Sequence, residues 1–341
     1  MEKYFMEEIE KTAESINSLA DENCFVFSLL ADVHIHPEQP EKMQHFERTL
    51  ENIEAVHKKC NVDALFYLGD IAFVNSVMKG VYWTEEILNR ELLSLKNNLC
   101  KCNENSFFVS GNHDGINARP ANPKNWYDKM IDTNKVNSVE NEGYFYVDFP
   151  DKKVRAVCLM DSWVEDLEKE NFFGYSKKQL QWISNTALDI PEGYKVLIFC
   201  HIMPESERNI NKLVNIEDLA GIFNAFCEKG KYKSENVCAD FTDRNDGELV
   251  AMFGGHSHVQ WSDYVGDIPI LQIQTPSNLI HMPQYEASWA ANLPEGWISV
   301  ERELNTLSED LWDTVIYDTK KNKIYVIRFG AGEDTEYSLC R

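Results

Sequence analysis

Short apolar runs alternate with longer polar stretches along most of the chain. These runs cover residues 25–30, 64–68, 107–109, 154–160, 195–200, 249–253 and 268–273. Several of them are apolar at nearly every position, which is typical of strands that are buried on both faces of a sheet. The pattern therefore predicts a central sheet whose strands are separated by other elements.

Some of the polar stretches have the period of amphipathic helices. Residues 41–59 and 176–187 are two examples, and the second opens with Ser176-Lys-Lys-Gln179, a capping-box pattern. Residues 1–20 have apolar side chains at spacings of three and four, namely Phe5, Ile9, Ala13, Ile16 and Leu19. We expect this first stretch to be a helix docked on the rest of the protein.

The C-terminal third predicts a hairpin and a long loop. Residues 312–318 and 323–329 alternate in polarity on either side of a short polar turn, so we expect a C-terminal β-hairpin over 312–329. Residues 275–308 contain three prolines and no regular period, which favours a long loop. No composition shift marks a boundary, so we expect one α/β domain over 1–341, with residues 1–22 as an N-terminal helical extension.

Potential metal ligands follow five of the apolar runs. They are Asp32, His34, Asp70, Asn112, His201, His256 and His258. Ligands of α/β proteins gather at the carboxyl edge of the sheet. The pairs at 32/34 and 256/258 would each face one side in an extended chain. A single histidine in such a position is more often a packing or surface residue, but five successive clusters at strand ends predict a metal centre.

The net charge restricts the classes of partner. The chain has 33 Lys and Arg against 56 Asp and Glu, a formal charge of −23. Nonspecific nucleic-acid binding and attachment to an anionic membrane both need basic surfaces, so neither is expected. An anionic substrate would have to be attracted locally, and two metal cations in a cleft would provide that attraction.

The cysteines and the N-terminal residues bear on the cellular compartment of the protein. Nine cysteines at irregular spacings, several inside apolar runs, are typical of free thiols in a reducing compartment. The first residues lack the pattern of a signal peptide, and no apolar run is long enough to span a bilayer. We therefore expect a cytoplasmic protein.

The order of the motifs resembles that of the calcineurin-like metallophosphoesterase superfamily. The motifs are Asp-x-His at 32–34, Gly-Asp at 69–70, Gly-Asn-His-Asp at 111–114, His201, and Gly-His-x-His at 255–258. The last motif makes the chain more similar to purple acid phosphatases and cyclic-nucleotide phosphodiesterases than to Ser/Thr protein phosphatases. The resemblance implies a four-layer α/β/β/α sandwich of two mixed β-sheets flanked by helices.

The resemblance also implies a division of the ligands between two ions. One ion would be held by Asp32, His34, Asp70 and His258, and the other by Asp70, Asn112, His201 and His256. Asp70 would bridge them, because a carboxylate has two oxygens to share. Mixed nitrogen and oxygen ligands suit Mn, Fe, Zn, Ni or Co, so the metal identity stays open.

The expected activity is metal-dependent hydrolysis of a phosphate monoester or diester. A hydroxide bound between two metals would attack phosphorus, and His113, positioned by Asp114, would assist the leaving group. The alternatives are a noncatalytic scaffold of the same fold, disfavoured because every ligand position is filled, and a nuclease, disfavoured by the charge. Monoester or diester preference, the natural small-molecule substrate and the oligomeric state stay open.

Some residues outside the motifs are candidates with competing interpretations. His36 is either a partner of the ligands or a solvated loop histidine, and Asn75 is the polar residue available after Gly-Asp. Asp161 either lines the cleft or caps a turn. Four others could contact substrate, although surface or packing roles are more common for such residues: Arg119, Trp163, Tyr175 and His281.

Overall fold

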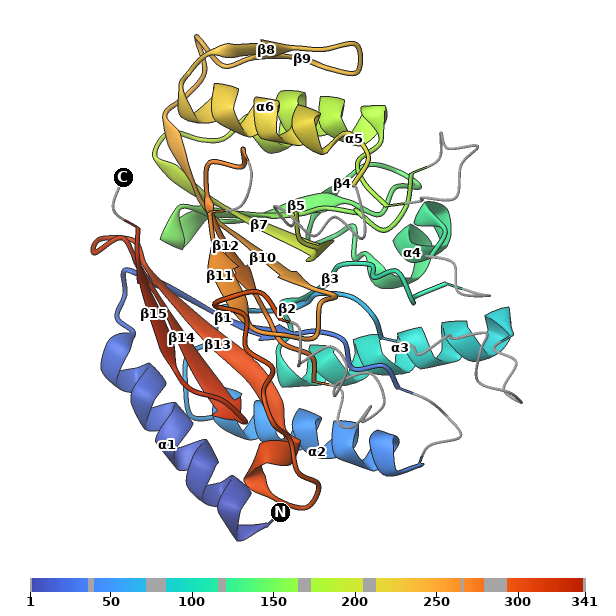
Figure 1. Cartoon of the computed structure of the whole chain (residues 1–341), viewed down its shortest axis with the longest axis vertical. Coiled ribbons are helices and arrows are strands. Elements are labelled where there is room, and N and C mark those ends of the chain that lie inside the picture. The colour runs from blue at the N-terminus through green and yellow to red at the C-terminus, as the bar shows by residue number, and fades with distance from the viewer. Residues whose placement is uncertain are drawn as a thin grey trace.

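Two β-sheets are stacked face to face between two layers of helices (Figure 1). This computed structural model describes residues 2–35, 40–71, 84–115, 121–164, 173–204, 213–264, 267–278 and 293–339. Helices α1, α2 and α3 lie along the bottom in Figure 1, and α5 and α6 lie along the top. The predicted four-layer arrangement of two mixed sheets is confirmed.

The first sheet has the strand order β15-β14-β13-β1-β2-β3. β1, β2 and β3 pair in parallel, whereas β13, β14 and β15 join through antiparallel pairings. Its strands are β1 (Cys24–Leu30), β2 (Ala64–Tyr67), β3 (Ser106–Phe108), β13 (Leu311–Asp318), β14 (Lys323–Gly330) and β15 (Thr335–Ser338). β13 and β14 form the predicted hairpin, while β15 was not predicted.

The second sheet has the order β11-β12-β10-β7-β6-β5-β4. Its centre, β6-β7-β10-β12, is parallel, and its edges are antiparallel. Its strands are β4 (Asn137–Ser138), β5 (Phe145–Phe149), β6 (Val154–Cys158), β7 (Tyr194–Ile202), β10 (Gly247–Gly255), β11 (Trp261–Asp263) and β12 (Leu271–Gln274). A separate small hairpin joins β8 (Lys231–Lys233) to β9 (Cys238–Asp240).

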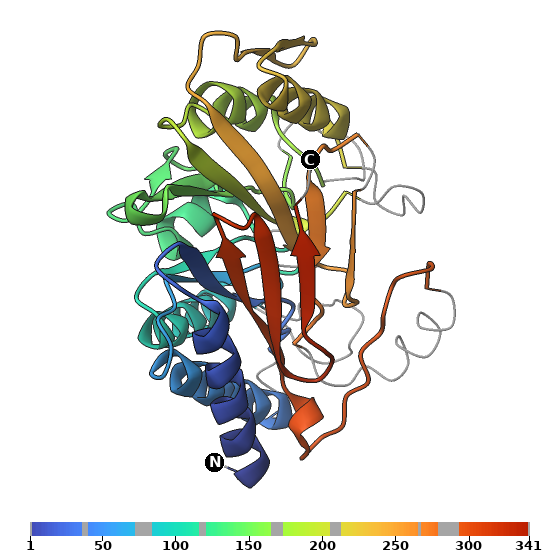
Figure 2. The same cartoon turned by 90° about the vertical axis from the view of Figure 1, so that its left-hand side faces the viewer.

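Helices cover the outer faces of both sheets. They are α1 (Lys3–Leu19), α2 (Pro40–His57), α3 (Glu85–Cys102), α4 (Pro123–Met130), α5 (Lys177–Trp182), which continues as a π-helical turn at Ile183–Ala187, and α6 (Ile216–Cys227). Figure 2 shows α1 running beside the C-terminal strands. Its predicted apolar stripe is buried, because Phe5, Ile9, Ala13 and Ile16 face that sheet. The docked N-terminal helix is therefore confirmed.

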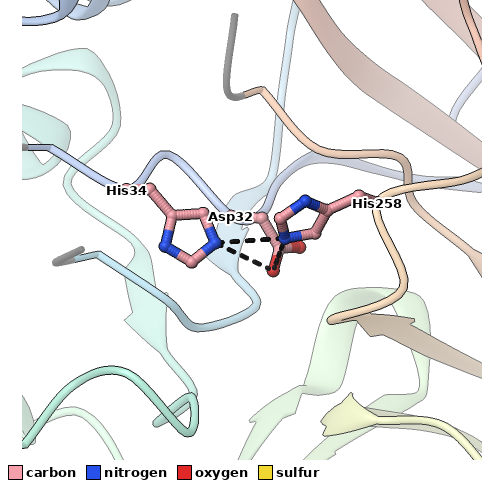
Figure 3. Close-up of side chains that lie close together, drawn as sticks. All are labelled: Asp32, His34 and His258. Atoms are coloured by element: carbon pink, nitrogen blue, oxygen red, sulfur yellow. Dashed lines mark hydrogen bonds and ion pairs between the residues drawn. The ribbon is translucent and has the colours of Figure 1, made fainter. Parts of the chain in front are cut away.

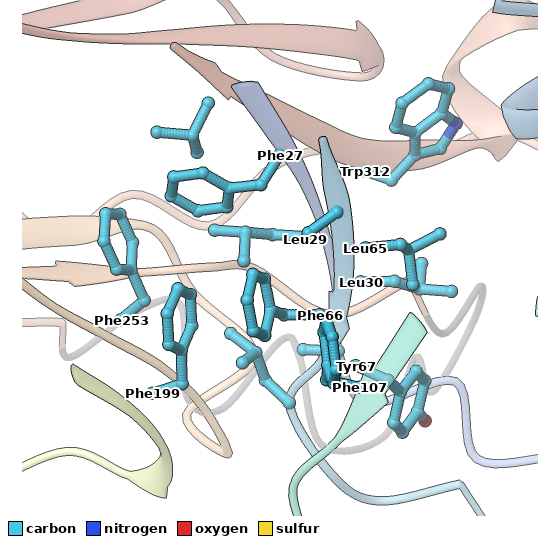
Figure 4. Packing of buried hydrophobic residues seen from close by; sticks show 14 of the residues in the cluster. Phe27, Leu29, Leu30, Leu65, Phe66, Tyr67, Phe107, Phe199, Phe253 and Trp312 are labelled. Carbon is cyan, nitrogen blue, oxygen red and sulfur yellow. The ribbon is translucent and has the colours of Figure 1, made fainter. Parts of the chain in front are cut away.

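Aromatic side chains join the two sheets (Figure 4). The Phe27 ring of β1 lies edge-on to Phe199 of β7 and to Phe253 of β10, with ring centroids 5.5 and 5.4 Å apart. Phe66 of β2 stacks on Phe199 at 3.9 Å. All four side chains are fully buried. This contact holds the parallel strands of both sheets together, so their carboxyl ends meet at one edge.

The capping box predicted at residues 176–179 is only half formed. The hydroxyl of Ser176 accepts the N–H of Gln179, as expected. The Gln179 side chain does not complete the box: it bonds to the backbone N–H and carbonyl of Met160, each at 2.8 Å. In an isolated helix, Gln179 could complete the capping box. Here its side chain instead satisfies the buried backbone groups of Met160, just after β6.

The expected long loop is irregular where it is described. Residues 275–278 and 293–306 contain no helix or strand, apart from a single bridge between Gln260 and Ile298, and residues 279–292 lie outside the described part. A short 3-10 helix, η3 (Leu307–Glu309), ends the segment. None of the helices in the described ranges has both the length and the apolar character needed to cross a membrane. The cytoplasmic location stays a prediction.

His57 at the end of α2 should make the stability of the fold depend on pH. Its Nδ1 donates to the carbonyl of Cys102 and its Nε2 accepts from the Ser28 hydroxyl, so the neutral ring satisfies both groups. Burial lowers the pKa of His57 to about 4, whereas the unfolded chain has a value of about 6.5. Above pH 6.5 the ring is neutral in both states. As pH falls toward 4 the unfolded state alone binds a proton, and stability is lost.

We expect the free energy of unfolding to fall by about 2 kcal/mol between pH 7 and pH 5 because of this one side chain. Urea unfolding of the protein and of His57→Gln at both pH values measures it. The difference between the two proteins isolates His57, because the other histidines are common to both. Equal pH dependence in the two proteins would contradict the prediction.

Candidate metal centre

The loops that follow β1 and β2 run side by side beyond the strand ends. The backbone N–H of Asp32 donates to the carbonyl of Gly69, and the N–H of His34 donates to the carbonyl of Asp70, both at 3.0 Å. On the other side, the Ser277 hydroxyl donates to the carbonyl of Asp32 at 2.8 Å. The first ligand candidates are therefore held by backbone bonds from two separate segments.

Asp32, His34 and His258 form one group of side chains (Figure 3). The Nε2 atoms of the two histidines are 3.1 Å apart. Asp32 Oδ1 lies 3.4 Å from Nε2 of His258 and 3.9 Å from Nε2 of His34. Asp32 and His34 are buried, while the side chain of His258 is 37% exposed and so leaves this group open to solvent.

Asp70, His201 and His256 form a second group. Asp70 Oδ2 lies 3.3 Å from His201 Nε2. Oδ1 of Asn112 joins them, at 2.9 Å from His201 Nε2 and 2.7 Å from His256 Nδ1. All seven ligand candidates predicted from the sequence thus lie in two adjacent clusters.

Asp70 lies between the two groups. Its Oδ2, which faces His201, is also 3.7 Å from Nε2 of His34 in the first group. Its Oδ1 accepts the backbone N–H of His113 at 2.7 Å. One carboxylate therefore faces the nitrogen atoms of both groups.

The backbone at these positions is left-handed, which corrects one step of the sequence argument. Five ligand candidates have positive φ angles: Asp32 (53°), His34 (47°), Asp70 (59°), His256 (75°) and His258 (58°). The 32/34 and 256/258 pairs were expected to be extended, with both side chains on one side because of strand alternation. Instead, tight turns direct the side chains, and 256 and 258 point into different groups. Such conformations cost on the order of 1 kcal/mol each for ordinary residues and gather at functional sites.

The donor atoms suit a cation. His201 Nδ1 donates to the Leu68 carbonyl at 2.6 Å, because a carbonyl can only accept. In the neutral ring, Nε2 is then a lone-pair donor, and it points at oxygens of Asp70 and Asn112 that are also lone-pair donors. Lone pairs that converge in a buried place need a positive charge between them. The residues present therefore fit metal ions.

Without an ion, a proton on His201 takes the place of that positive charge. Burial favours the neutral ring of His201, but the negative charge of Asp70 and its hydrogen bond outweigh burial and raise the pKa of His201 to about 10. Burial, followed by the charge of His201, lowers the pKa of His256 to about 3. The group therefore stabilises one buried positive charge, which is the property that a cation site needs.

His113 lies at the rim of the two groups. Its side chain is 28% exposed, with Nε2 at 4.0 Å from Asp70 Oδ2 and its ring centroid 5.2 Å from that of His34. Asp114 is fully buried, and its carboxylate accepts the backbone N–H groups of Asp70, Ile71 and Gly111 at 2.7–3.1 Å. Asp114 therefore fixes the loop that carries His113 to the loop that carries Asp70.

Asp161 bonds to the backbone of one ligand candidate. Its Oδ2 accepts the N–H groups of His201 and Ile202 at 2.9 Å, and the side chain is fully buried. Burial raises the pKa of Asp161 to about 6. Sequence reasoning left open whether this residue lined the cleft or capped a turn. It does neither, because it holds the end of β7 in the position that presents His201.

Phe173 is a neighbour of the ligands that sequence reasoning missed. Its ring lies 6.4 Å from the ring of His256 in an edge-on arrangement. Its backbone is fixed by a bridge between Gly174 and Val214. Phe173 belongs to none of the sequence motifs, so only the tertiary structure reveals it.

The remaining candidates have different outcomes. Tyr175 is fully buried in the core that packs against the second sheet, which favours its packing role. Trp163 is half-buried and lines a small surface pocket together with Tyr144 and Met160. Four candidates lie outside the described residues: His36, Asn75, Arg119 and His281.

Gly111 has no room for a side chain, which gives a testable expectation. A Cβ there would lie 2.2 Å from the backbone nitrogen and from Oδ1 of Asp70. Gly111→Ala should therefore displace Asp70 and weaken metal binding about 10- to 100-fold, as changes next to metal ligands do. Metal titration measures this effect. Gly230→Ala is the matched control, because its Cβ would meet nothing nearer than 3.9 Å, and equal affinities in the two variants would refute the expectation.

Comparison with known proteins identifies the family. The family model for calcineurin-like phosphoesterases matches residues 25–260. The chain therefore belongs to the calcineurin-like phosphoesterase family, and the resemblance noted in the sequence is confirmed. The matched segment contains every ligand candidate in both groups. No curated protein matches the sequence.

The solved structures that are similar to this chain are distant from it in sequence. A conserved uncharacterized protein from Streptococcus pneumoniae TIGR4, described as a predicted phosphoesterase, is 12% identical, with 92% of this chain and 98% of that chain covered and a TM-score of 0.31. GAP50, the anchor in the inner membrane complex of Plasmodium, is 10% identical over 93% and 90%, with a TM-score of 0.46. Vacuolar Protein Sorting 29 from Cryptosporidium parvum is 10% identical over 92% and 98%, with a TM-score of 0.37. These similarities say nothing about the activity of this chain.

Proposed function

We propose that this protein is a hydrolase that cleaves a phosphate ester with the help of two metal ions. The observation that carries the proposal is the arrangement of Asp70: one buried carboxylate faces two groups of metal-ligating side chains, with His113 at the rim. Family membership supports the same reaction class.

The two groups would each hold one ion. Asp32, His34 and His258 would hold the first, His201, His256 and Asn112 the second, and Asp70 would contribute to both. When bound, the ions would supply Lewis-acid charge for the phosphate and would make a water molecule acidic enough to act as the nucleophile at neutral pH. Mn, Fe, Zn, Ni and Co all suit this ligand set.

His113 would protonate the leaving oxygen. It is the rim histidine that neither group includes, and its side chain is in part open to the space where an ester would enter. Asp114 keeps this histidine next to the ligands, because its carboxylate bonds the two loops together. An alkoxide is a poor leaving group, so a proton delivered from His113 would accelerate the cleavage of alkyl esters most.

The overall charge favours a small substrate over a nucleic acid. A protein with a net charge of −23 repels a polyanion, while one phosphate group can be held locally by two cations. We therefore infer a small phosphate ester as the substrate, and leave monoester and diester as the two outcomes of the assay.

The test is an ester assay on protein stripped of metal and then reloaded with Mn²⁺. Metal content is measured first, and bis(p-nitrophenyl) phosphate and p-nitrophenyl phosphate are then compared. Turnover that disappears with the metal and returns with it supports the proposal, and the ratio of the two rates distinguishes diester from monoester preference. Protein that holds two ions yet cleaves neither these esters nor a panel of alkyl phosphates would instead be a binding scaffold.

A further inference from the structure

A short buried segment, residues 274–278, lies against the loop that carries Asp32. It begins at the last residue of β12, and all five of its residues are buried. The Ser277 hydroxyl donates to the carbonyl of Asp32 at 2.8 Å, and the backbone N–H of Asn278 donates to the carbonyl of Ala31 at 3.0 Å. The backbone at the first ligand candidate is therefore bonded to this segment at two successive residues.

The same segment also bonds to the turn that leads to His256. The N–H of Thr275 donates to the carbonyl of Gly254 at 2.8 Å, and the side-chain amide of Gln274 donates to the carbonyl of Gly255. The segment thus connects two parts of the chain that carry ligand candidates and lie far apart in the sequence.

One arginine, Arg302, bonds to the end of this segment. Its Nη1 donates to the carbonyl of Ser277 at 2.9 Å, and its Nη2 donates to the carbonyl of Asn278 at 3.2 Å. The same guanidinium bonds to two carbonyls of η3, because Nε donates to Ser308 at 2.8 Å and Nη2 donates to Glu309. Four backbone carbonyls from two separate stretches therefore meet on one side chain.

Arginine is the side chain that can make this set of bonds. Its planar guanidinium has five N–H donors spread over three nitrogen atoms, whereas the ammonium group of lysine has three donors on one nitrogen. A lysine at position 302 would therefore reach fewer of the four carbonyls. Asn278 would keep its own bond to β13, where its side-chain amide donates to the carbonyl of Leu311 at 2.7 Å. Ser277 has no such second anchor in η3 or β13 among the printed bonds of its carbonyl.

We propose that Arg302 is a positioning residue of the metal centre, which acts on Asp32 through Ser277. The guanidinium holds the backbone of Ser277, and the Ser277 hydroxyl holds the backbone of Asp32. Asp32 has a φ of 53°, a left-handed conformation that persists only where neighbouring contacts support it. The inference rests on the metal-binding part of the proposed function and not on ester hydrolysis.

The effect should be larger at the first ligand group (Asp32, His34 and His258) than at the second. In the second group, His201 is held by the carbonyl of Leu68 and by the carboxylate of Asp161, and neither belongs to the 274–278 segment. His256 follows a turn that the segment does bond, but through Thr275 and Gln274, to which none of the four bonds of Arg302 is made. Removal of Arg302 should therefore distinguish the two groups.

The test is a Co²⁺ titration of metal-stripped protein, followed by visible absorption in competition with a chelator. Co²⁺ suits mixed nitrogen and oxygen ligands. His34→Ala and His201→Ala assign the two binding steps to the first and second groups. Arg302→Lys keeps the charge and should weaken binding at the first group about 10- to 100-fold, as changes behind metal ligands do, while the second group changes less than about threefold.

Ser277→Ala tests the same route with a smaller change, and it keeps the test valid if Arg302→Lys fails to fold. Loss of the hydroxyl that bonds to the Asp32 carbonyl should weaken binding at the first group about three- to tenfold. Because both residues act through one series of contacts, the double variant should bind little more weakly than Arg302→Lys alone. Losses that multiply would contradict the route through Ser277.

Arg155→Lys is the matched control. Arg155 is 3% exposed and, like Arg302, donates to several backbone carbonyls, namely those of Thr186, Ala187 and Asp189. Urea unfolding should show that both lysine variants are less stable, but Arg155→Lys should keep both Co²⁺ affinities. An equal loss of affinity in Arg155→Lys would show that metal binding only follows overall stability, and would overturn the proposal.

The titration contains no ester, so its result is separate from that of the hydrolysis assay. Unchanged affinities in Arg302→Lys and Ser277→Ala, or equal losses at both groups, would overturn this inference alone. Protein that shows the expected selective loss yet cleaves no ester would contradict the proposed function and leave Arg302 as a positioning residue. Unaltered protein that binds no ion would overturn both.

Discussion

Asp70→Ala should lose metal and activity together. Asp70 is the carboxylate that faces both ligand groups, so its removal takes a candidate ligand from each. It also removes the negative charge that contributes most to raising the pKa of His201. Changes next to metal ligands already cost about 10- to 100-fold in affinity, so loss of a shared ligand should cost at least about 100-fold. Metal content after dialysis and the rate of ester hydrolysis are the two measurements.

The control for this variant is Asp128→Ala. Asp128 is an exposed residue of α4 whose carboxylate contacts Lys124, so its removal changes the net charge by the same amount without affecting the centre. Retention of two ions by Asp70→Ala would show that this carboxylate is not shared. Loss of activity with both ions retained would give Asp70 a different role.

His113→Ala should slow the hydrolysis of alkyl esters by about 10²- to 10⁴-fold, the usual effect of removing a general acid. The loss on p-nitrophenyl esters should be much smaller, because nitrophenolate leaves readily without a proton. The variant should keep both ions, since His113 belongs to neither of the two ligand groups found among the described residues. Rates on both ester classes, measured together with metal content, check these expectations.

His57→Gln provides the matched control, because it removes a histidine from the far end of α2 and not from the centre. Equal losses on alkyl and aryl esters in His113→Ala would exclude the role of a general acid. Loss of metal in the same variant would make His113 a ligand instead. Either result would change the mechanism without changing the family.

Much of the fold could be predicted from local pattern. The buried strands β1, β2, β7 and β10 are apolar at most positions, and α1 has its stripe at helical spacing, so hydrophobic period alone placed them. The π-helical end of α5 and six strands were not predicted, namely β4, β5, β8, β9, β11 and β15. β15 alternates between half-buried and exposed positions at a sheet edge, and the π-helical turn buries Ile183, Ser184 and Ala187.

Residue type and chain order determined which side chains take part in the centre. Aspartate, asparagine and histidine after successive buried strands can serve few purposes other than metal binding, and parallel strands deliver them to one edge. All seven predicted ligands are found there. The directions of these side chains were decided by the tertiary structure. Five of the seven residues adopt left-handed backbone angles, which the neighbouring loops impose.

The supporting residues were beyond the reach of sequence reasoning. Asp161 holds His201 from the segment that follows β6, and Phe173 lies next to His256 where Gly174 pairs with Val214. The sequence by itself thus determined the central buried strands, the family and the candidate ligands, since these depend on residue type and period. The tertiary structure alone decided the directions of side chains, their burial and their neighbours, because those depend on contacts between segments far apart in the chain.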